Sequence, residues 1–152
     1  MKKSAVLFLA LMLVFSFSSA ASAKTVFKLA HVYNPGHAWD KGAHHVAELV
    51  KEKSGGEIEI QVFPASQLGT EEQITEAVIF GSVDMCVSGA GQIGNLFKPI
   101  NICEMPYTFR DNNHVLKFAK SDIAKKMFSD LEKEFNIKVV GTSSFGIRQL
   151  TS

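Results

Sequence analysis

Polar residues that could bind a ligand follow the predicted strands of this chain, at the points where each strand ends. His31 lies near the end of an apolar, β-rich stretch at residues 25–32, and Arg148 follows a similar stretch close to the end of the chain. The ends of two further predicted strands lead into residues 64–69 and 88–91. In an open α/β sheet, ligands bind beyond the carboxyl ends of the strands, so these segments together predict a polar binding site.

Arg148 is the residue of this group best suited to bind an anion. It stands in the stretch SSFGIRQLTS, among small and hydroxyl residues and without a carboxylate beside it. A guanidinium presents a planar fork of donors that matches the two oxygens of a carboxylate. The residues by themselves nevertheless favour a surface arginine at a strand end.

Glu71 and His31 each allow a structural and a functional interpretation. Glu71 lies in the first turn of a helix that opens with TEEQ, in which Thr70 and Gln73 form a capping box. An acid at this position stabilises the helix dipole, and the residues favour that role. His31 can be a core histidine with satisfied hydrogen bonds or a contact in the binding site, and both interpretations stay open.

Motifs of catalysis and of cofactor binding are absent from the sequence. It has no G-x-S-x-G, G-x-x-x-x-G-K-[ST], G-x-G-x-x-G or H-E-x-x-H, and no acid or cysteine completes a metal set with its histidines. We therefore predict no catalytic residues, no metal site and no cofactor. The alternative is an exported α/β hydrolase or lyase that uses His31 and Glu71 as acid and base.

Residues 1–23 are predicted to be a cleaved secretory signal peptide. Lys2 and Lys3 precede an apolar run, and ASA at residues 21–23 supplies the small residues that a signal peptidase needs. An uncleaved anchor is disfavoured because no stop-transfer pattern follows the run. The remaining 129 residues, 24–152, are expected to form one domain in the periplasm.

The charge balance and the cysteines limit the possible partners. Without Lys2 and Lys3, the 16 basic residues become 14 against 15 acidic residues, and they form no cluster. This balance argues against nucleic acid as a partner.

Cys86 and Cys103 lie in apolar stretches, which favours buried thiols over a disulfide, although whether they pair stays open.

Hydrophobic periodicity predicts strands that alternate with helices. The expected elements are a strand at 25–32, a helix at 37–53, an edge strand at 57–63, a helix at 70–81, a strand at 83–90, an irregular stretch at 91–111, a long helix at 112–135 and a fourth strand at 137–144. This alternation indicates an α/β fold with a mainly parallel sheet flanked by helices on both faces.

The segment SGGEIEIQVFPASQLGTEEQITEAVIFGSVDM, with FKLAHV before it and MPYTFRDNNHVLKF and SSFGIRQLTS after it, resembles the DctP-type solute-binding proteins of TRAP transporters. The resemblance covers residues 24–152 and implies a lobe like those of type II periplasmic binding proteins, the first of two that close around a solute. It also implies a non-enzymatic receptor whose partners are a small organic acid (a dicarboxylate, keto acid or sugar acid) and the small and large membrane subunits of the permease. A structural module that docks through residues 91–111 is a further alternative.

The resemblance also implies the ligand-binding residues. The positions that match cleft contacts of the family are His31, Glu71, Ser88, Gly89, Gln92 and Arg148. Arg148 would line the cleft where the chain crosses between the lobes. Because members of the family run considerably further, we expect a truncated chain that ends at the crossing to a missing second lobe, which would carry the principal carboxylate-binding arginine.

Overall fold

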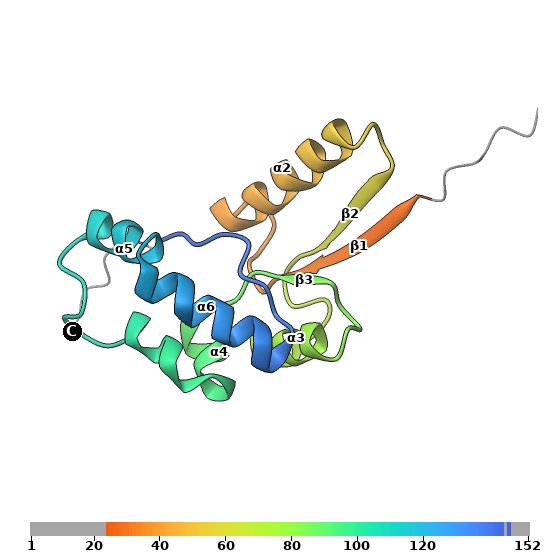
Figure 1. Cartoon of the computed structure of the whole chain (residues 1–152). Helices are drawn as coiled ribbons and strands as arrows, with labels where there is room; N and C mark the ends of the chain where they lie inside the picture. Colours follow the sequence, from red (N-terminus) through yellow and green to blue (C-terminus); the bar gives the residue numbers. More distant parts are fainter. Residues whose placement is uncertain (1–23, 145, 147–152) are drawn as a thin grey trace, which may run out of the picture.

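The computed structural model describes residues 24–144 and 146 (Figure 1). Its elements in chain order are β1 (Thr25–Ala30), α2 (Ala38–Lys53), β2 (Ile58–Phe63), α3 (Glu71–Ile79), β3 (Met85–Cys86), α4 (Ala90–Leu96), the 3-10 helix η1 (Lys98–Cys103), α5 (Asn112–Ala119) and α6 (Asp122–Phe135).

The three strands form a parallel sheet in the order β2-β1-β3. β1 pairs with β2 along its whole length, whereas it pairs with β3 only through Leu29 with Met85 and Ala30 with Cys86. The prediction of a parallel sheet with residues 57–63 at its edge is therefore confirmed. The third strand is much shorter than the predicted 83–90.

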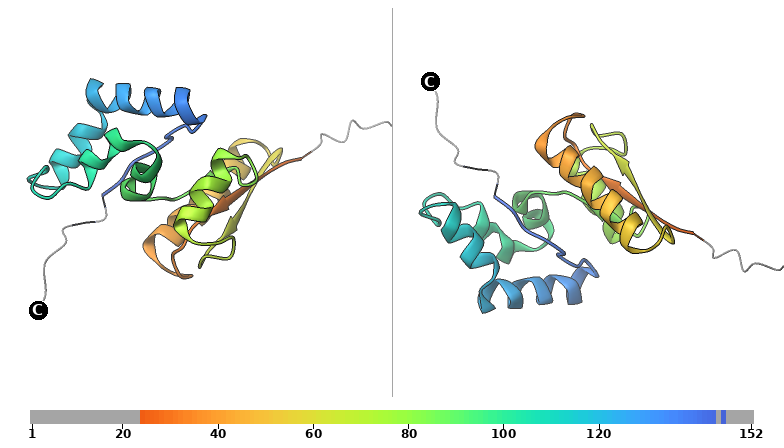
Figure 2. Two further views of the ribbon diagram at one scale, coloured as in Figure 1. Left: turned by 90° about the horizontal axis from the view of Figure 1, so that it is seen from below. Right: turned by 90° about the horizontal axis from the view of Figure 1, so that it is seen from above.

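Helices cover both faces of the sheet, as the α/β prediction required. Successive residues of a strand point to opposite faces. Leu29 packs with Ala43 of α2 on one face, and Ala30 packs with Ile74 of α3 on the other. Figure 2 shows α2 and α3 on opposite sides of the strands.

The ends of α2 and α3 follow local sequence signals. The Nδ1 atom of His37 accepts a hydrogen bond from the backbone N–H of Trp39 and caps α2, and both Gly55 and Gly56 have positive φ just after its end. Thr70 and Gln73 form the predicted capping box at the start of α3. These caps place the first turn of each helix next to the carboxyl end of a strand.

The second half of the described chain forms a helical group beside the sheet. Its core contains Phe97, Ile100, Met127 and Leu131, which come from η1, the residue before it and α6. Figure 1 shows α4, α5 and α6 together on the side of the sheet toward which β3 leads. The described part of the chain therefore has one apolar cluster on each face of the sheet and a third among these helices.

The prediction of one long helix over residues 112–135 is wrong. The structure divides this range into α5 and α6 because Ser121 has extended backbone angles and its hydroxyl accepts the N–H of Ala124. A new cap therefore begins a second helix. Apolar spacing continues through the break, so periodicity did not reveal it.

The prediction of an irregular stretch over residues 91–111 is also wrong, since this range contains most of α4 and all of η1. Gly94 lies inside α4 where a Cβ would be 1.7 Å from the side-chain oxygen of Asn101. That side chain donates to the carbonyl of Gly94 and joins α4 to η1. Gly94 thus allows the Asn101 side chain to approach the α4 backbone closely, and it does not mark the end of a helix.

The predicted fourth strand over residues 137–144 is not present in the described structure. Ile137 and Val139 pack against the helical core instead of the sheet. The segment then reaches α5, where the Ser144 hydroxyl donates to Asn112 at 2.8 Å. Its alternating apolar residues pack against helices. The period-two pattern shows that one side of the segment is apolar, but it does not show whether a sheet or helices cover that side.

Candidate functional site

Three of the predicted site residues, Glu71, Ser88 and Gly89, lie together where α3 begins and where the chain leaves β3. One oxygen of the Glu71 carboxylate accepts the backbone N–H of Gly89 at 2.5 Å and the Ser88 hydroxyl at 3.3 Å. Gly89 is also the N-cap residue of α4 and receives no side-chain cap of its own. The carboxylate therefore ties the start of α3 to the start of α4.

Thr75 completes this group, and the sequence analysis did not identify it. Its hydroxyl is buried, donates to the carbonyl of Glu71 at 2.8 Å and lies 3.0 Å from the Ser88 hydroxyl. The spacing of four residues between Glu71 and Thr75 on one helix was the available signal. The arrangement is an acid and two hydroxyls next to a helix start, which suits hydrogen bonding to polar groups of a solute.

Gln92 lies one turn further along α4. Its backbone N–H donates to the carbonyl of Gly89 at 3.2 Å, and its side-chain oxygen is 3.5 Å from the amide nitrogen of Asn95. The side chain is half-buried. Gln92 is thus joined through the α4 backbone to the Glu71 group, although no hydrogen bond joins the two side chains among the described residues.

His31 is held separately, at the carboxyl end of β1. Its residue is 0% exposed, and its Nε2 lies 3.5 Å from a carboxylate oxygen of Asp40 in α2. Burial lowers the pKa of His31, with the Asp40 carboxylate opposing that effect. His31 is therefore buried, as in the core interpretation, but within the described part of the chain its ring nitrogens lack the hydrogen bonds which that interpretation assumed.

His31 and Glu71, the acid and base of the enzymatic alternative, have different contacts in the structure. Glu71 is engaged by Gly89 and Ser88, while His31 faces Asp40. Among the described residues no hydrogen bond or ion pair joins the two. Arg148, the predicted carboxylate ligand, lies outside the described residues.

Groups of residues that could hold a metal are not found in the part of the chain that the structure describes. Both cysteines are free and half-buried, and burial raises the pKa of the Cys86 thiol to about 11 and that of Cys103 in the same direction. The predominance of the thiol form makes both cysteines weak nucleophiles near neutral pH.

Within residues 24–144 and 146, no helix combines the length and apolar character needed to cross a membrane.

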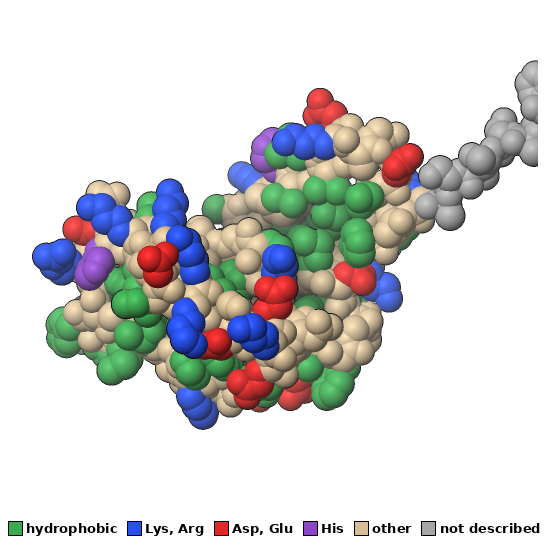
Figure 3. Space-filling view, in the orientation of Figure 1, with side chains coloured by type: hydrophobic (Ala, Val, Ile, Leu, Met, Phe, Trp, Pro, Cys, Tyr) green, Lys and Arg blue, Asp and Glu red, His purple; other side chains and the backbone are tan. Residues whose placement is uncertain are grey.

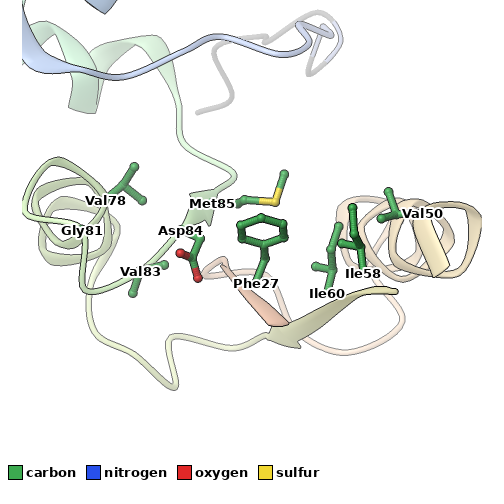
Figure 4. Close-up of a pocket in the computed structure, with 9 residues that line it drawn as sticks. All are labelled: Phe27, Val50, Ile58, Ile60, Val78, Gly81, Val83, Asp84 and Met85. Carbon is green, nitrogen blue, oxygen red and sulfur yellow. The ribbon is translucent and has the colours of Figure 1, made fainter. Parts of the chain in front are cut away.

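An apolar groove of 480 Å³ lies along the sheet, with Val50 of α2 on one side and Val78 of α3 on the other (Figure 4). Phe27, Ile60 and Met85 project into it from the three strands, and the space-filling view shows hydrophobic side chains gathered beside α2 (Figure 3). Its charged side chain, Asp84, accepts the backbone N–H of Lys28. A groove with an acid and no cation does not suit a carboxylate, so we do not assign the solute site to it.

Comparisons with known proteins define the class to which this fold and site belong. The model of the bacterial extracellular solute-binding proteins, family 7 (DctP), matches residues 29–152. The chain therefore belongs to this family, whose members include the solute-binding proteins of TRAP transporters.

Particular relatives agree with this assignment. The chain is 32% identical over 127 residues to the C4-dicarboxylate-binding protein DctB of Bacillus subtilis. The aligned region covers 84% of this chain and 36% of that protein. It is 28% identical to a TRAP periplasmic solute-binding protein of Haemophilus influenzae with bound L-gulonate, with a TM-score of 0.72 over 78% of this chain and 38% of that one. A similar protein of Sulfurospirillum deleyianum with bound succinate gives 26% identity and a TM-score of 0.68 over 74% of this chain and 36% of that one.

The chain thus spans little more than a third of the length of these relatives. The structural likeness confirms the predicted fold class, an open parallel sheet flanked by helices. The family is one of receptors for solutes rather than of hydrolases or lyases.

Proposed function

We propose that this chain is the first lobe of an extracytoplasmic receptor that binds a small organic acid for a TRAP transporter. The match of residues 29–152 to the family is the observation that carries the proposal. Relatives with bound L-gulonate and succinate suggest sugar acids and dicarboxylates as the solute class, with keto acids also to be tested. In such a receptor a second lobe closes on the first about a hinge and excludes water from the solute.

The proposed binding residues are Arg148, Glu71, Ser88, Gly89, Gln92 and His31. Arg148 would grip the solute carboxylate through two parallel hydrogen bonds, which are strong where water is excluded. Glu71 and Ser88 would accept and donate hydrogen bonds to solute hydroxyl groups, supported by their position beside the start of α4. Because His31 is buried, it would act from beneath the site.

The remaining parts of the proposal concern location and partners. We infer that residues 1–23 are removed as a signal peptide and that the mature receptor acts in the periplasm, which agrees with the extracellular family. Its partners would be the small and large membrane subunits of the permease. We also infer that the protein is not an enzyme, since it belongs to a family of solute-binding proteins.

Calorimetry on the full-length protein with a panel of dicarboxylates, keto acids and sugar acids tests the proposal. At least one should bind, and Arg148→Ala should weaken that binding by about tenfold or more, because a bidentate pair is lost. Arg110→Ala is the matched control, since Arg110 is exposed in a loop outside the proposed site. Absence of binding across the panel, or equal effects of both substitutions, would contradict the proposal.

A further inference from the structure

We propose that His31, Asp40 and His44 form a proton-responsive link between the carboxyl end of β1 and the first turns of α2. The Asp40 carboxylate is shared between the two histidines, because its Oδ1 atom lies 3.5 Å from Nε2 of His31 and 3.5 Å from Nε2 of His44. The two rings differ in their access to water. The side chain of His31 is 0% exposed, that of Asp40 is 7% exposed and that of His44 is 57% exposed.

The buried atoms of this group have incomplete hydrogen bonding. Both ring nitrogens of His31 and the Oδ1 atom of Asp40 are buried without a hydrogen-bond partner in the described structure. The other Asp40 oxygen accepts the backbone N–H of Gly36 at 2.7 Å. A buried carboxylate oxygen therefore lies beside a buried imidazole, and their interaction depends on the charge that each group carries.

The groups that act on His31 compete in sign. Burial has the largest effect and lowers the pKa of His31, because a charged ring would lose its hydration. The Asp40 carboxylate and the backbone of Tyr33 raise it, whereas His44 and His37 lower it. The Asp40 carboxylate therefore limits how far burial lowers the pKa of His31.

The expected consequence for stability follows from the lowered pKa of His31. The unfolded chain, with a histidine pKa of about 6.5, takes up the proton before the folded chain does. This contribution to stability is fully present above that pH and decreases as the pH falls through about 6.5 toward the lower pKa of the folded state.

The link has a route to the proposed binding site. The backbone N–H of His31 donates to the Phe63 carbonyl at 3.1 Å, and its carbonyl accepts the N–H of Ser66 at 3.2 Å. Residues 64–69 form one of the segments beyond the strand ends, and Ala65 and Ser66 in it have positive φ. Protonation of His31 would therefore act on the edge where the solute is proposed to bind. This step rests on the proposed function.

NMR titration of the His31 ring in the purified protein tests the link without any solute. Asp40→Asn should lower the pKa of His31 further, and His44→Gln should raise it, because they remove effects of opposite sign. His45→Gln is the matched control, since His45 is an exposed neighbour on the same helix and no ion pair joins it to Asp40 among the described residues. We expect the pKa of His31 to shift in opposite directions in the two variants and to stay unchanged in His45→Gln. If the pKa of His31 is unchanged in His44→Gln, the proposal is overturned, even if Asp40→Asn does not fold.

Calorimetry across pH 5–8 separates this inference from the proposed function. If a carboxylate binds, its affinity should change with pH over the range in which His31 titrates, and His44→Gln should move that range upward whereas His45→Gln should not. If the pKa of His31 shifts in opposite directions in the two variants but the protein binds no carboxylate, the link is supported and the proposed receptor function is contradicted. Binding that depends on Arg148, together with an unmoved pH profile and titration in His44→Gln, would contradict the link alone.

Discussion

Glu71 has one structural role that its sequence position predicted and a second that only the fold creates. It lies in the first turn of α3, where its charge favours the helix dipole, and its carboxylate also accepts the N–H that begins α4. The sequence pattern predicted the first role, while the second required Gly89 to be brought to it from 18 residues away. A solute that binds here would therefore meet a carboxylate whose position is already set.

Glu71→Gln should reduce the free energy of unfolding by about 1 kcal/mol, because a neutral amide replaces the charged acceptor of the Gly89 N–H. Chemical denaturation near neutral pH measures the effect. Glu72→Gln is the matched control, since Glu72 shares the first turn of α3 and its dipole but is exposed. If the two substitutions cost the same, the bond to Gly89 does not contribute and only the dipole acts.

At the scale of elements, caps and close contacts determine where helices begin and how they pack. α5 and α6 are separated by the Ser121 cap although the apolar spacing runs through both. α4 and η1 are joined by the Asn101 side chain, which occupies the space that Gly94 leaves open. Both features depend on contacts of individual polar atoms, which hydrophobic periodicity does not record.

Gly94→Ala should destabilise the protein by about 1–3 kcal/mol in thermal or chemical unfolding, even though alanine favours helices. The new methyl group would displace the Asn101 side chain and break its bond to the Gly94 carbonyl. Gly42→Ala provides the control in α2, where nothing lies within 4 Å of the new Cβ. It should stabilise the protein by about 0.5–1 kcal/mol, and stabilisation by both substitutions would show that the α4–η1 contact is not needed.

At the scale of the whole molecule, residues 24–144 and 146 contain three apolar clusters, one on each face of the sheet and one among the helices. The third cluster gathers α4, η1, α6 and the segment at 137–139 from positions far apart in the chain. Leu131 is 1% exposed at its centre. The helical group should therefore depend strongly on this one side chain.

Leu131→Ala should lower the free energy of unfolding by about 2–5 kcal/mol, because it removes buried methyl groups and leaves a cavity. Ile123→Ala is the comparison on the same helix, where Ile123 is 72% exposed, and it should change the free energy by less than about 0.5 kcal/mol. Similar costs for the two variants in chemical denaturation would mean that the helical cluster does not stabilise the fold.

Local signals in the sequence were sufficient to predict a parallel sheet with residues 57–63 at its edge and the capping box formed by Thr70 and Gln73. They were also sufficient to recognise the family. Each depends on residues that are neighbours in the chain or share one periodic face. The family resemblance implied Glu71, Ser88 and Gly89 as site residues, and the structure brings these three together.

The tertiary structure decided what depends on distant contacts. Only the fold brings Asp40 between His31 and His44, buries His31, adds Thr75 to the Glu71 group and directs Ile137 and Val139 to helices instead of the sheet. The physical reason is that periodicity reports which side of a segment is apolar, whereas the partner that covers this side is chosen by packing across the whole chain.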